Sequence, residues 1–439
     1  LWAGGSGGSI SIINSLTSTD NAIELTAGGA INGLLSDSAA IHALSLTARA
    51  GTGINLNGAI GTVPSVDLQN STSGDIVYYG AATPGLYVTT NNQATSGAID
   101  IQNEGHLTVN TVTSVNGNID LRAGGALTVT GPVTSSTGDI DFYAVQPMTF
   151  SGDTATGGTV YLIPSDGSAP EVRIAATPGE YFYISGDESG NLNKFTTPCL
   201  SIGKLSSNEV GSVTFDAPVD FSNAGSLRIF SQSSITQATG ATITVPELYL
   251  KAGNDATLLE ANMVNKLAAT MPYGQLVFNN AKALAIDTAS QYNGIDLSNN
   301  YNSIVISTSA GDLTVNQPIK SFEGYIQLGA SAGQIHLQSS VGYDDSQNGY
   351  LPGPVKLAAA TGIIGNAAGI VTATEMEVVS TSGNVTLNAL NKIPTIAGSI
   401  AGTGSFEYQG AEGFAVGAVG DSTGLTVADG NILLTAVAQ

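Results

Sequence analysis

The chain has 439 residues and a net charge of −22, yet charged side chains make up only 10% of it, against about 25% in ordinary soluble domains. A surface this acidic repels phosphate backbones and anionic lipid headgroups, so the composition argues against nucleic-acid binding and against docking on an anionic membrane. The hydrophobic content of 42% is too high for a disordered chain. No apolar run is long enough to cross a membrane, so we expect no transmembrane segment.

A turn glycine followed by an apolar–polar–apolar triplet recurs at a fixed period. The apolar residues that open four such triplets are Ile99, Ile119, Ile140 and Val160. Their spacing of about 20 residues is typical of a chain that stacks on itself. Each triplet is a short strand with one buried face, which a single unit cannot bury alone. The pattern predicts an all-β, right-handed parallel β-helix with rungs of roughly 20–22 residues.

Earlier triplets extend this pattern toward the start of the chain with a similar spacing. They are Ile23-Glu24-Leu25, Leu44-Ser45-Leu46 and Val66-Asp67-Leu68. We therefore expect regular rungs over residues 1–162, with Glu24 and Asp67 in the same phase as the outward residues of the later triplets. Only the segment 260–269 favours a helix, as a short excursion from the solenoid.

Residues 163–210 break the regular pattern. Four prolines and the aromatic run Tyr181-Phe182-Tyr183 fall in this stretch. Because proline cannot donate to a sheet ladder, we interpret the stretch as an irregular or inserted segment. Rungs resume over residues 211–439, and we expect one solenoid, with two β-helical domains separated near 163–210 as the alternative. Both ends of the sequence resemble interior strands, which predicts that it is part of a longer chain.

Asp100, Asp120 and Asp141 occupy the polar middle of consecutive triplets. Stacked in register, they would form a column of carboxylates about 4.8 Å apart. Such a column is a candidate Ca²⁺ site, because hard cations prefer carboxylate oxygens; a solvated acidic stripe is the simpler alternative. The three histidines are scattered and Cys199 is the one cysteine, so no zinc site, disulfide or other cofactor is expected.

Two further segments are candidates for contact with a ligand. Asp139 and Asp141 lie on one face of a strand, and paired carboxylates can hydrolyse glycosides. No Arg, Lys or His lies beside them in the sequence, so we expect no catalytic role. The run Tyr181-Phe182-Tyr183 is instead a candidate contact surface for a sugar ring or a protein.

Three segments share one sequence pattern: residues 118–131 (NIDLRAGGALTVTG), 22–31 (AIELTAGGAI) and 383–390 (GNVTLNAL). This pattern resembles the repeats of the filamentous haemagglutinin-like adhesins of the two-partner secretion pathway. The resemblance implies an extracellular bacterial β-helical stalk at the cell surface or in a biofilm matrix. Its expected partners are cell-surface glycans or proteins, or copies of itself joined end to end. The alternative is a polysaccharide lyase or glycoside hydrolase built on a β-helix.

Overall fold

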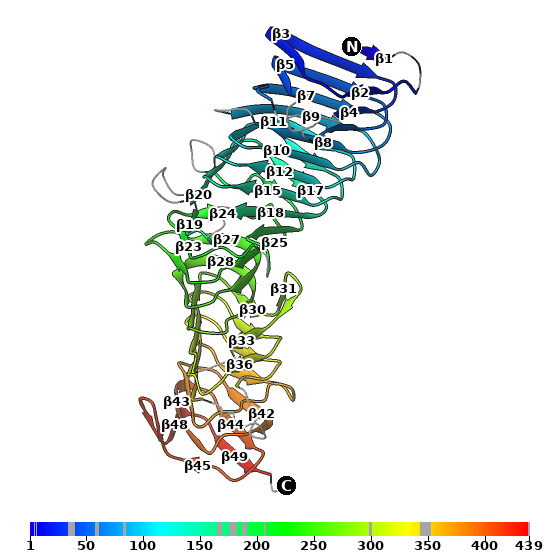
Figure 1. Ribbon diagram of the computed structural model, residues 1–439. Helices are drawn as coiled ribbons and strands as arrows, with labels where there is room; N and C mark the ends of the chain where they lie inside the picture. Colours follow the sequence, from blue (N-terminus) through cyan, green and yellow to red (C-terminus); the bar gives the residue numbers. More distant parts are fainter. Residues whose placement is uncertain are drawn as a thin grey trace. The chain divides into compact units, whose positions relative to one another are not determined.

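The computed structural model describes residues 1–437 except 4, 6, 34–39, 58–60, 82–84, 165–168, 175–181, 187–190, 206–207, 298–300 and 343–352. Within these residues there is no helix, and parallel strands stacked about 22 residues apart form a β-solenoid of about 18 turns (Figure 1). The predicted parallel β-helix is therefore confirmed. The chain divides into two compact units, Leu1–Gly211 with Val219–Gly225 and Ser212–Pro218 with Ser226–Gln439.

One stack of strands runs through the first unit and carries the predicted triplets. Its strands are β2 (Ile10–Ile12), β4 (Ile31–Gly33), β6 (Ile54–Leu56), β8 (Ile76–Gly80), β10 (Ile99–Asn103), β12 (Ile119–Ala123), β15 (Ile140–Ala144), β18 (Thr159–Pro164) and β22 (Cys199–Ile202). The other strands are β1 (Trp2–Ala3), β3 (Leu16–Ala27), β5 (Ile41–Ala50), β7 (Ser65–Asn70), β9 (Gly85–Asn92), β11 (His106–Ser114), β13 (Leu127–Val129), β14 (Val133–Ser135), β16 (Met148–Phe150), β17 (Thr154–Thr156), β19 (Val172–Ile174), β20 (Phe182–Ser185), β21 (Phe195–Thr196) and β24 (Val219–Asp220).

A column of aliphatic side chains forms part of the core behind the first stack. Its members are Ile10, Ile31, Ile54, Ile76, Ile99, Ile119, Ile140, Val160 and Leu200, each the Cα partner of the next. All are buried. The predicted column from Ile99 to Val160 is confirmed, and it extends further in both directions than the four triplets indicated.

The register predicted for the earliest triplets is wrong. Ile23 pairs with Leu46 and not with Leu44, so the triplet in register with Ile23-Glu24-Leu25 begins two residues later than the spacing indicated. Leu46 in turn pairs with Val66. Leu44 is consequently 57% exposed.

Glu24 and Asp67 also lie in a different stack from Asp100, so their assignment to its column is wrong. They belong to β3 and β7, whereas Asp100 belongs to β10, which pairs with β8 and β12. Arg49 of β5 lies between the two acids, with its guanidinium nitrogens 3.1 Å from Glu24 Oε1 and 3.6 Å from Asp67 Oδ2. The error arose because both stacks contain similar triplets, and spacing alone does not distinguish them.

A ladder of buried polar side chains holds the turns of the first unit. Its members are Asn70, Asn92, Ser114, Ser135, Thr156 and Thr197. Ser114 Oγ donates to the Gly97 carbonyl at 2.9 Å and accepts from the Gly117 amide at 3.0 Å. Ser135 repeats this pattern with the Gly117 carbonyl and the Gly138 amide. A Cβ at Gly117 would lie 2.0 Å from the Gly97 oxygen, which explains why the turn position is glycine.

The second unit continues with short parallel strands, in which Leu313 and Ile335, for example, are Cα partners. Its strands are β23 (Val213–Phe215), β25 (Ser226–Phe230), β26 (Ile235–Gln237), β27 (Ile243–Lys251), β28 (Ala256–Thr270), β29 (Leu276–Asn280), β30 (Leu284–Ile286), β31 (Thr288–Ala289), β32 (Tyr292–Asn293), β33 (Ile295–Leu297), β34 (Ile304–Thr308), β35 (Leu313–Val315), β36 (Ile319–Ser321), β37 (Ile326–Ala330), β38 (Ile335–Leu337), β39 (Val355–Ala359), β40 (Ile363–Gly365), β41 (Met376–Ser380), β42 (Val385–Asn391), β43 (Thr395–Thr403), β44 (Phe406–Gly410), β45 (Ala415–Val416), β46 (Ala418–Val419), β47 (Ser422–Thr423), β48 (Leu425–Asp429) and β49 (Ile432–Ala436).

The helix predicted over residues 260–269 is wrong. This segment lies within β28, whose register with β29 shifts between Leu258 and Asn262. Leu258, Val264 and Leu267 of the strand are fully buried. Pairing with the turns on either side outweighs the local helix propensity of the segment.

Candidate functional site

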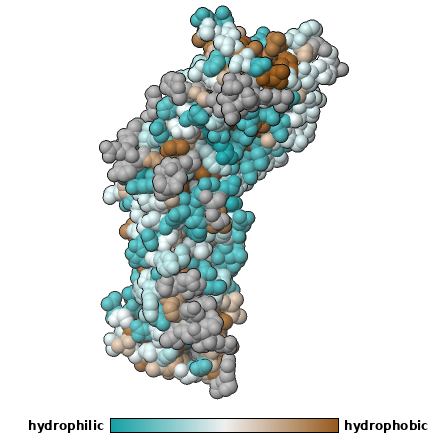
Figure 2. All heavy atoms as spheres, in the orientation of Figure 1, coloured by the Kyte–Doolittle hydropathy of each residue, from teal (hydrophilic) through white to brown (hydrophobic). Residues whose placement is uncertain are grey.

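The outward face of the first stack brings the three predicted aspartates together. Asp100, Asp120 and Asp141 are successive Cα partners on β10, β12 and β15. Asp100 is exposed, whereas Asp120 and Asp141 are partly buried. In Figure 2, hydrophilic side chains gather over this part of the first unit.

Arg122 neutralises the centre of this column. It lies two residues after Asp120 on the same outward face and forms an ion pair with Asp120 Oδ2. Burial nevertheless raises the pKa of Asp120 to about 6, opposed by Arg122 and reinforced by the charges of Asp100 and Asp141. Burial also raises the pKa of Asp100, against the influence of Arg122.

Lys204 and Tyr143 engage the next carboxylate. Lys204 Nζ lies 3.3 Å from Asp141 Oδ2, and the Tyr143 hydroxyl donates to the same oxygen at 3.1 Å. Lys204 also lies 4.4 Å from the ring centroid of Tyr161, and the Arg122 guanidinium lies 4.1 Å from that of Tyr143. No basic residue lies beside Asp141 in the sequence, but Lys204 reaches it from the segment after β22.

The two partly buried carboxylates, those of Asp120 and Asp141, each have one oxygen without a partner. Asp120 Oδ1 and Asp141 Oδ1 are buried and make no hydrogen bond. In the part of the chain that the structure describes, no three His, Cys, Asp or Glu side chains are grouped so that they could hold a metal ion. Arg122 and Lys204 instead occupy the side of the carboxylates where a cation would bind.

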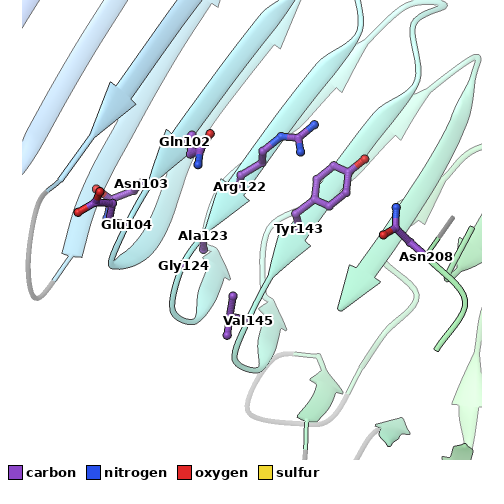
Figure 3. A pocket seen from close by; sticks show the side chains of 9 residues that line it. All are labelled: Gln102, Asn103, Glu104, Arg122, Ala123, Gly124, Tyr143, Val145 and Asn208. Carbon is purple, nitrogen blue, oxygen red and sulfur yellow. The ribbon is translucent and has the colours of Figure 1, made fainter. Parts of the chain in front are cut away.

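A polar hollow of about 520 Å³ lies beside the column (Figure 3). It is lined by Gln102, Asn103, Glu104, Arg122, Ala123, Gly124, Tyr143, Val145 and Asn208. Arg122 and Tyr143 extend side by side from neighbouring strands, and Asn208 enters from a separate segment. Backbone bonds of 2.9 and 3.2 Å between Lys204 and Asn208 hold that segment in place.

The chemistry of the hollow suits a hydroxyl-rich, uncharged ligand. Amide, carboxylate and guanidinium groups supply both donors and acceptors, and Tyr143 adds an aromatic surface. Glu104 is anchored by the Tyr79 hydroxyl, which donates to it at 2.8 Å. Glu104 and Arg122 carry opposite charges, so the lining favours neither an anion nor a cation.

The remaining predicted residues lie apart from this hollow. Asp139 Oδ1 accepts the Thr159 amide at 2.7 Å and so braces a turn. Phe182 is only 7% exposed and Tyr183 is partly exposed, while Tyr181 is outside the described residues. Cys199 is buried.

A second, smaller hollow of about 380 Å³ lies elsewhere in the first unit. Its lining consists of Thr17, Thr19, His42, Ala43, Leu44, Thr62 and Pro64. His42 Nδ1 lies 2.9 Å from Thr62 Oγ1, and no carboxylate lines the hollow. It offers fewer polar groups than the hollow beside Arg122.

In comparisons with known proteins, no family model, no curated protein and no solved structure matches this chain. The structure itself identifies a β-helical repeat protein. Within the described ranges, no helix has the length and apolar character needed to cross a membrane. Function must therefore be argued from the site.

Proposed function

We propose that the chain is an extracellular structural and adhesive β-helical protein, part of a bacterial cell-surface stalk or biofilm-matrix filament, that binds glycans in the hollow beside Arg122 and Tyr143. The observation that carries this proposal is the hollow itself, whose polar and aromatic groups project from adjacent, in-register strands. A rigid sheet holds such groups in place before the ligand arrives, which reduces the entropy lost on binding. The haemagglutinin-like repeats support the same class of function.

The partners of the aspartates favour binding over catalysis. A general acid or base must come within hydrogen-bond distance of the reacting group. Asp120 and Asp141 instead direct one oxygen to Arg122 or Lys204 and bury the other. Their present arrangement stabilises the face of the sheet that borders the hollow.

A glycan-binding assay with the purified chain tests the proposal. We expect retention of at least one neutral glycan from a broad panel, with affinity reduced about three- to tenfold by Gln102→Ala or Asn208→Ala, since each removes one or two hydrogen bonds. Gln69→Ala, an outward glutamine of β7 in the other stack, is the matched control and should bind normally. A panel with no retained glycan, or equal losses in all three variants, would contradict the proposal.

A carbohydrate-active enzyme is the second candidate, and one observation favours it. Asp120, with its raised pKa, neighbours Asp141 on the next turn, at a backbone spacing of about 4.8 Å that resembles the carboxylate separation of retaining glycosidases. Incubation with polysaccharides, followed by assays for new reducing ends and unsaturated products, tests this candidate. Turnover that Asp120→Asn and Asp141→Asn both abolish would establish it; no products across the panel would remove it.

A further inference from the structure

Two β-hairpins interrupt the parallel stacking of the second unit. In the first, β31 pairs with β32 at Ala289 and Tyr292; in the second, β46 pairs with β47 at Val419 and Ser422. Each turn has two residues and begins with a positive φ, 51° at Ser290 and 57° at Gly420. Such turns match the twist of the strands that they join.

The strands around the two hairpins pair in the same order. β30 and β33, which flank the first hairpin, both pair with β28. β45 and β48, which flank the second, both pair with β43. The next strand then pairs one turn back, β34 with β29 and β49 with β44. β28 therefore corresponds to β42 and β43 together.

The backbone bonds that close the two hairpins also correspond. Gly294 donates to the Asp287 carbonyl at 3.1 Å, and Gly424 donates to the Gly417 carbonyl at 2.6 Å. The carbonyl of each glycine accepts an amide from the second half of β28 or from β43, at 3.0 and 2.8 Å. Both glycines have positive φ, 61° and 75°. The separation in sequence between Gly294 and Gly424 equals that between Asp287 and Gly417.

A buried asparagine repeats at nearly the same distance along the chain. Asn262 and Asn391 are the two copies, and each is at most 1% exposed. Each Oδ1 accepts a backbone amide at 2.9 Å, from Ile243 or Val371. Each Nδ2 donates at 3.0 Å to a carbonyl of the following turn. Both lie where the register of a strand pair shifts.

Each hairpin turn folds back onto a glutamate near the start of its own segment. The Ser290 amide donates to Glu247 Oε2 at 2.9 Å, and the Asp421 amide donates to Glu377 Oε1 at 3.1 Å. The two bonds span 43 and 44 residues, which is about two turns. Glu247 and Glu377 have the same separation in sequence as the two hairpin glycines.

A lysine also pairs with each glutamate, Lys266 from the turn after Glu247 and Lys356 from the turn before Glu377. Lys266 pairs with Glu247 at 2.9 Å and Lys356 with Glu377 at 2.8 Å. Burial opposes the ionisation of Glu377, but Lys356, the Ser422 hydroxyl and the backbone amide outweigh it and lower its pKa. The side chain of Glu377 is only 4% exposed.

The first hairpin is also held by an aromatic cluster. Tyr292 stacks on Tyr249, with ring centroids 3.7 Å apart and planes 8° apart. Phe230 meets both rings edge-on. This hairpin therefore lies across the outward faces of β25, β27 and β28, whose side chains it buries.

We propose that residues 243–308 and 371–436 are two copies of one module, and that the hairpin of each copy is a clasp that holds closed the two turns before it. In a solenoid each turn contacts only its neighbours, so turns can open one by one. A hairpin that bonds to a glutamate two turns back couples turns that are not adjacent. The clasp adds to the proposed structural role and needs no ligand.

Hydrogen exchange followed by mass spectrometry tests the proposal on the whole chain. Glu377→Gln removes the negative charge of the carboxylate to which the second hairpin bonds. Amides in β39, β41 and β43 should therefore exchange roughly tenfold faster or more. Amides in β25, β27 and β28 should keep the wild-type rate. Glu247→Gln should produce the reverse pattern, and Glu412→Gln, an exposed glutamate of the same unit, is the control and should change neither region.

Ser422→Ala keeps the test decisive if Glu377→Gln does not fold, since it removes only the hydroxyl bond of 2.7 Å to Glu377. It should accelerate exchange in the same strands, to a smaller extent. Unchanged rates in both variants, or acceleration spread evenly along the chain, would overturn the clasp. Neither result depends on glycan binding, so failure of the clasp is distinguishable from failure of the proposed function.

Discussion

Asp120 and Asp141 are Cα partners on neighbouring turns, and each has one carboxylate oxygen bonded to a cation and the other buried without a partner. Two like charges so placed repel each other unless a proton or a cation lies between or beside them. Here Arg122 pairs with Asp120 and Lys204 pairs with Asp141, and their positive charges reduce this repulsion. The stability of the folded chain should therefore depend on the charges of these side chains.

The pH dependence of stability should reveal Asp120. Its pKa in the folded chain is about 6, above its ordinary value of 3.8, so the folded state holds the proton more tightly. Stability should therefore fall as the pH rises from about 4 to about 6, by about 1–2 kcal/mol after allowance for solvent screening. Urea unfolding across this range should show the decline in the wild type and its loss in Asp120→Asn. The same slope in both proteins would contradict the assignment.

Calcium should leave stability unchanged. Arg122 and Lys204 already lie against the carboxylates of Asp120 and Asp141, so Ca²⁺ would have to displace them. We expect the same melting temperature in millimolar Ca²⁺ and in chelator. A Ca²⁺-dependent rise that Asp120→Asn removes would instead establish the carboxylate column as a cation site.

Ile119→Asp should destabilise the first unit by several kcal/mol. The side chain is 1% exposed in a dry aliphatic column, where a carboxylate would find no partner. Ile119→Val, which keeps the column apolar, is the matched control and should cost about 1 kcal/mol. Thermal melts of the wild type and the two variants test this prediction. Equal melting temperatures would show that the column is not a closed core.

Ser135→Ala should cost about 1–3 kcal/mol, because it leaves the Gly117 carbonyl and the Gly138 amide without their shared partner. The adjacent Ser136 is exposed, so Ser136→Ala provides a control with the same chemical change. Denaturant unfolding should separate the two variants. Equal effects would show that the buried ladder contributes little to stability.

Local repeats made the fold predictable, but not all of its register. The column from Ile99 to Val160 could be predicted because one stack carries evenly spaced triplets with one phase. Leu44 was misassigned because Leu44 and Leu46 both fit an apolar–polar–apolar triplet, and only the pairing shows that Leu46 is the partner of Ile23. Strand pairing and burial also decided the conformation of residues 260–269, for which local propensity predicted a helix.

The site was predictable only where its residues share a strand. Asp100, Asp120 and Asp141 follow from the period, and Arg122 and Tyr143 could have been found two residues after an aspartate on the same face. Lys204 could not, since it lies 63 residues from Asp141 in the sequence and reaches it only when the chain folds back. The repeated module of the second unit could not be predicted either. Its two copies have the same pattern of hydrogen bonds and strand pairing, but few identical residues at corresponding positions.

The buried ladder also limits how the length of this protein can change. Ser114, Ser135 and Thr156 each bond to a glycine of their own turn and to a glycine of the turn before. Each of these turns therefore fits against any neighbour of the same kind. A whole turn, such as 119–139, could be gained or lost while the strand pairing and the ladder bonds find equivalent partners. Removal of a single residue would break the match on both sides. Length in such a chain changes in steps, one turn at a time.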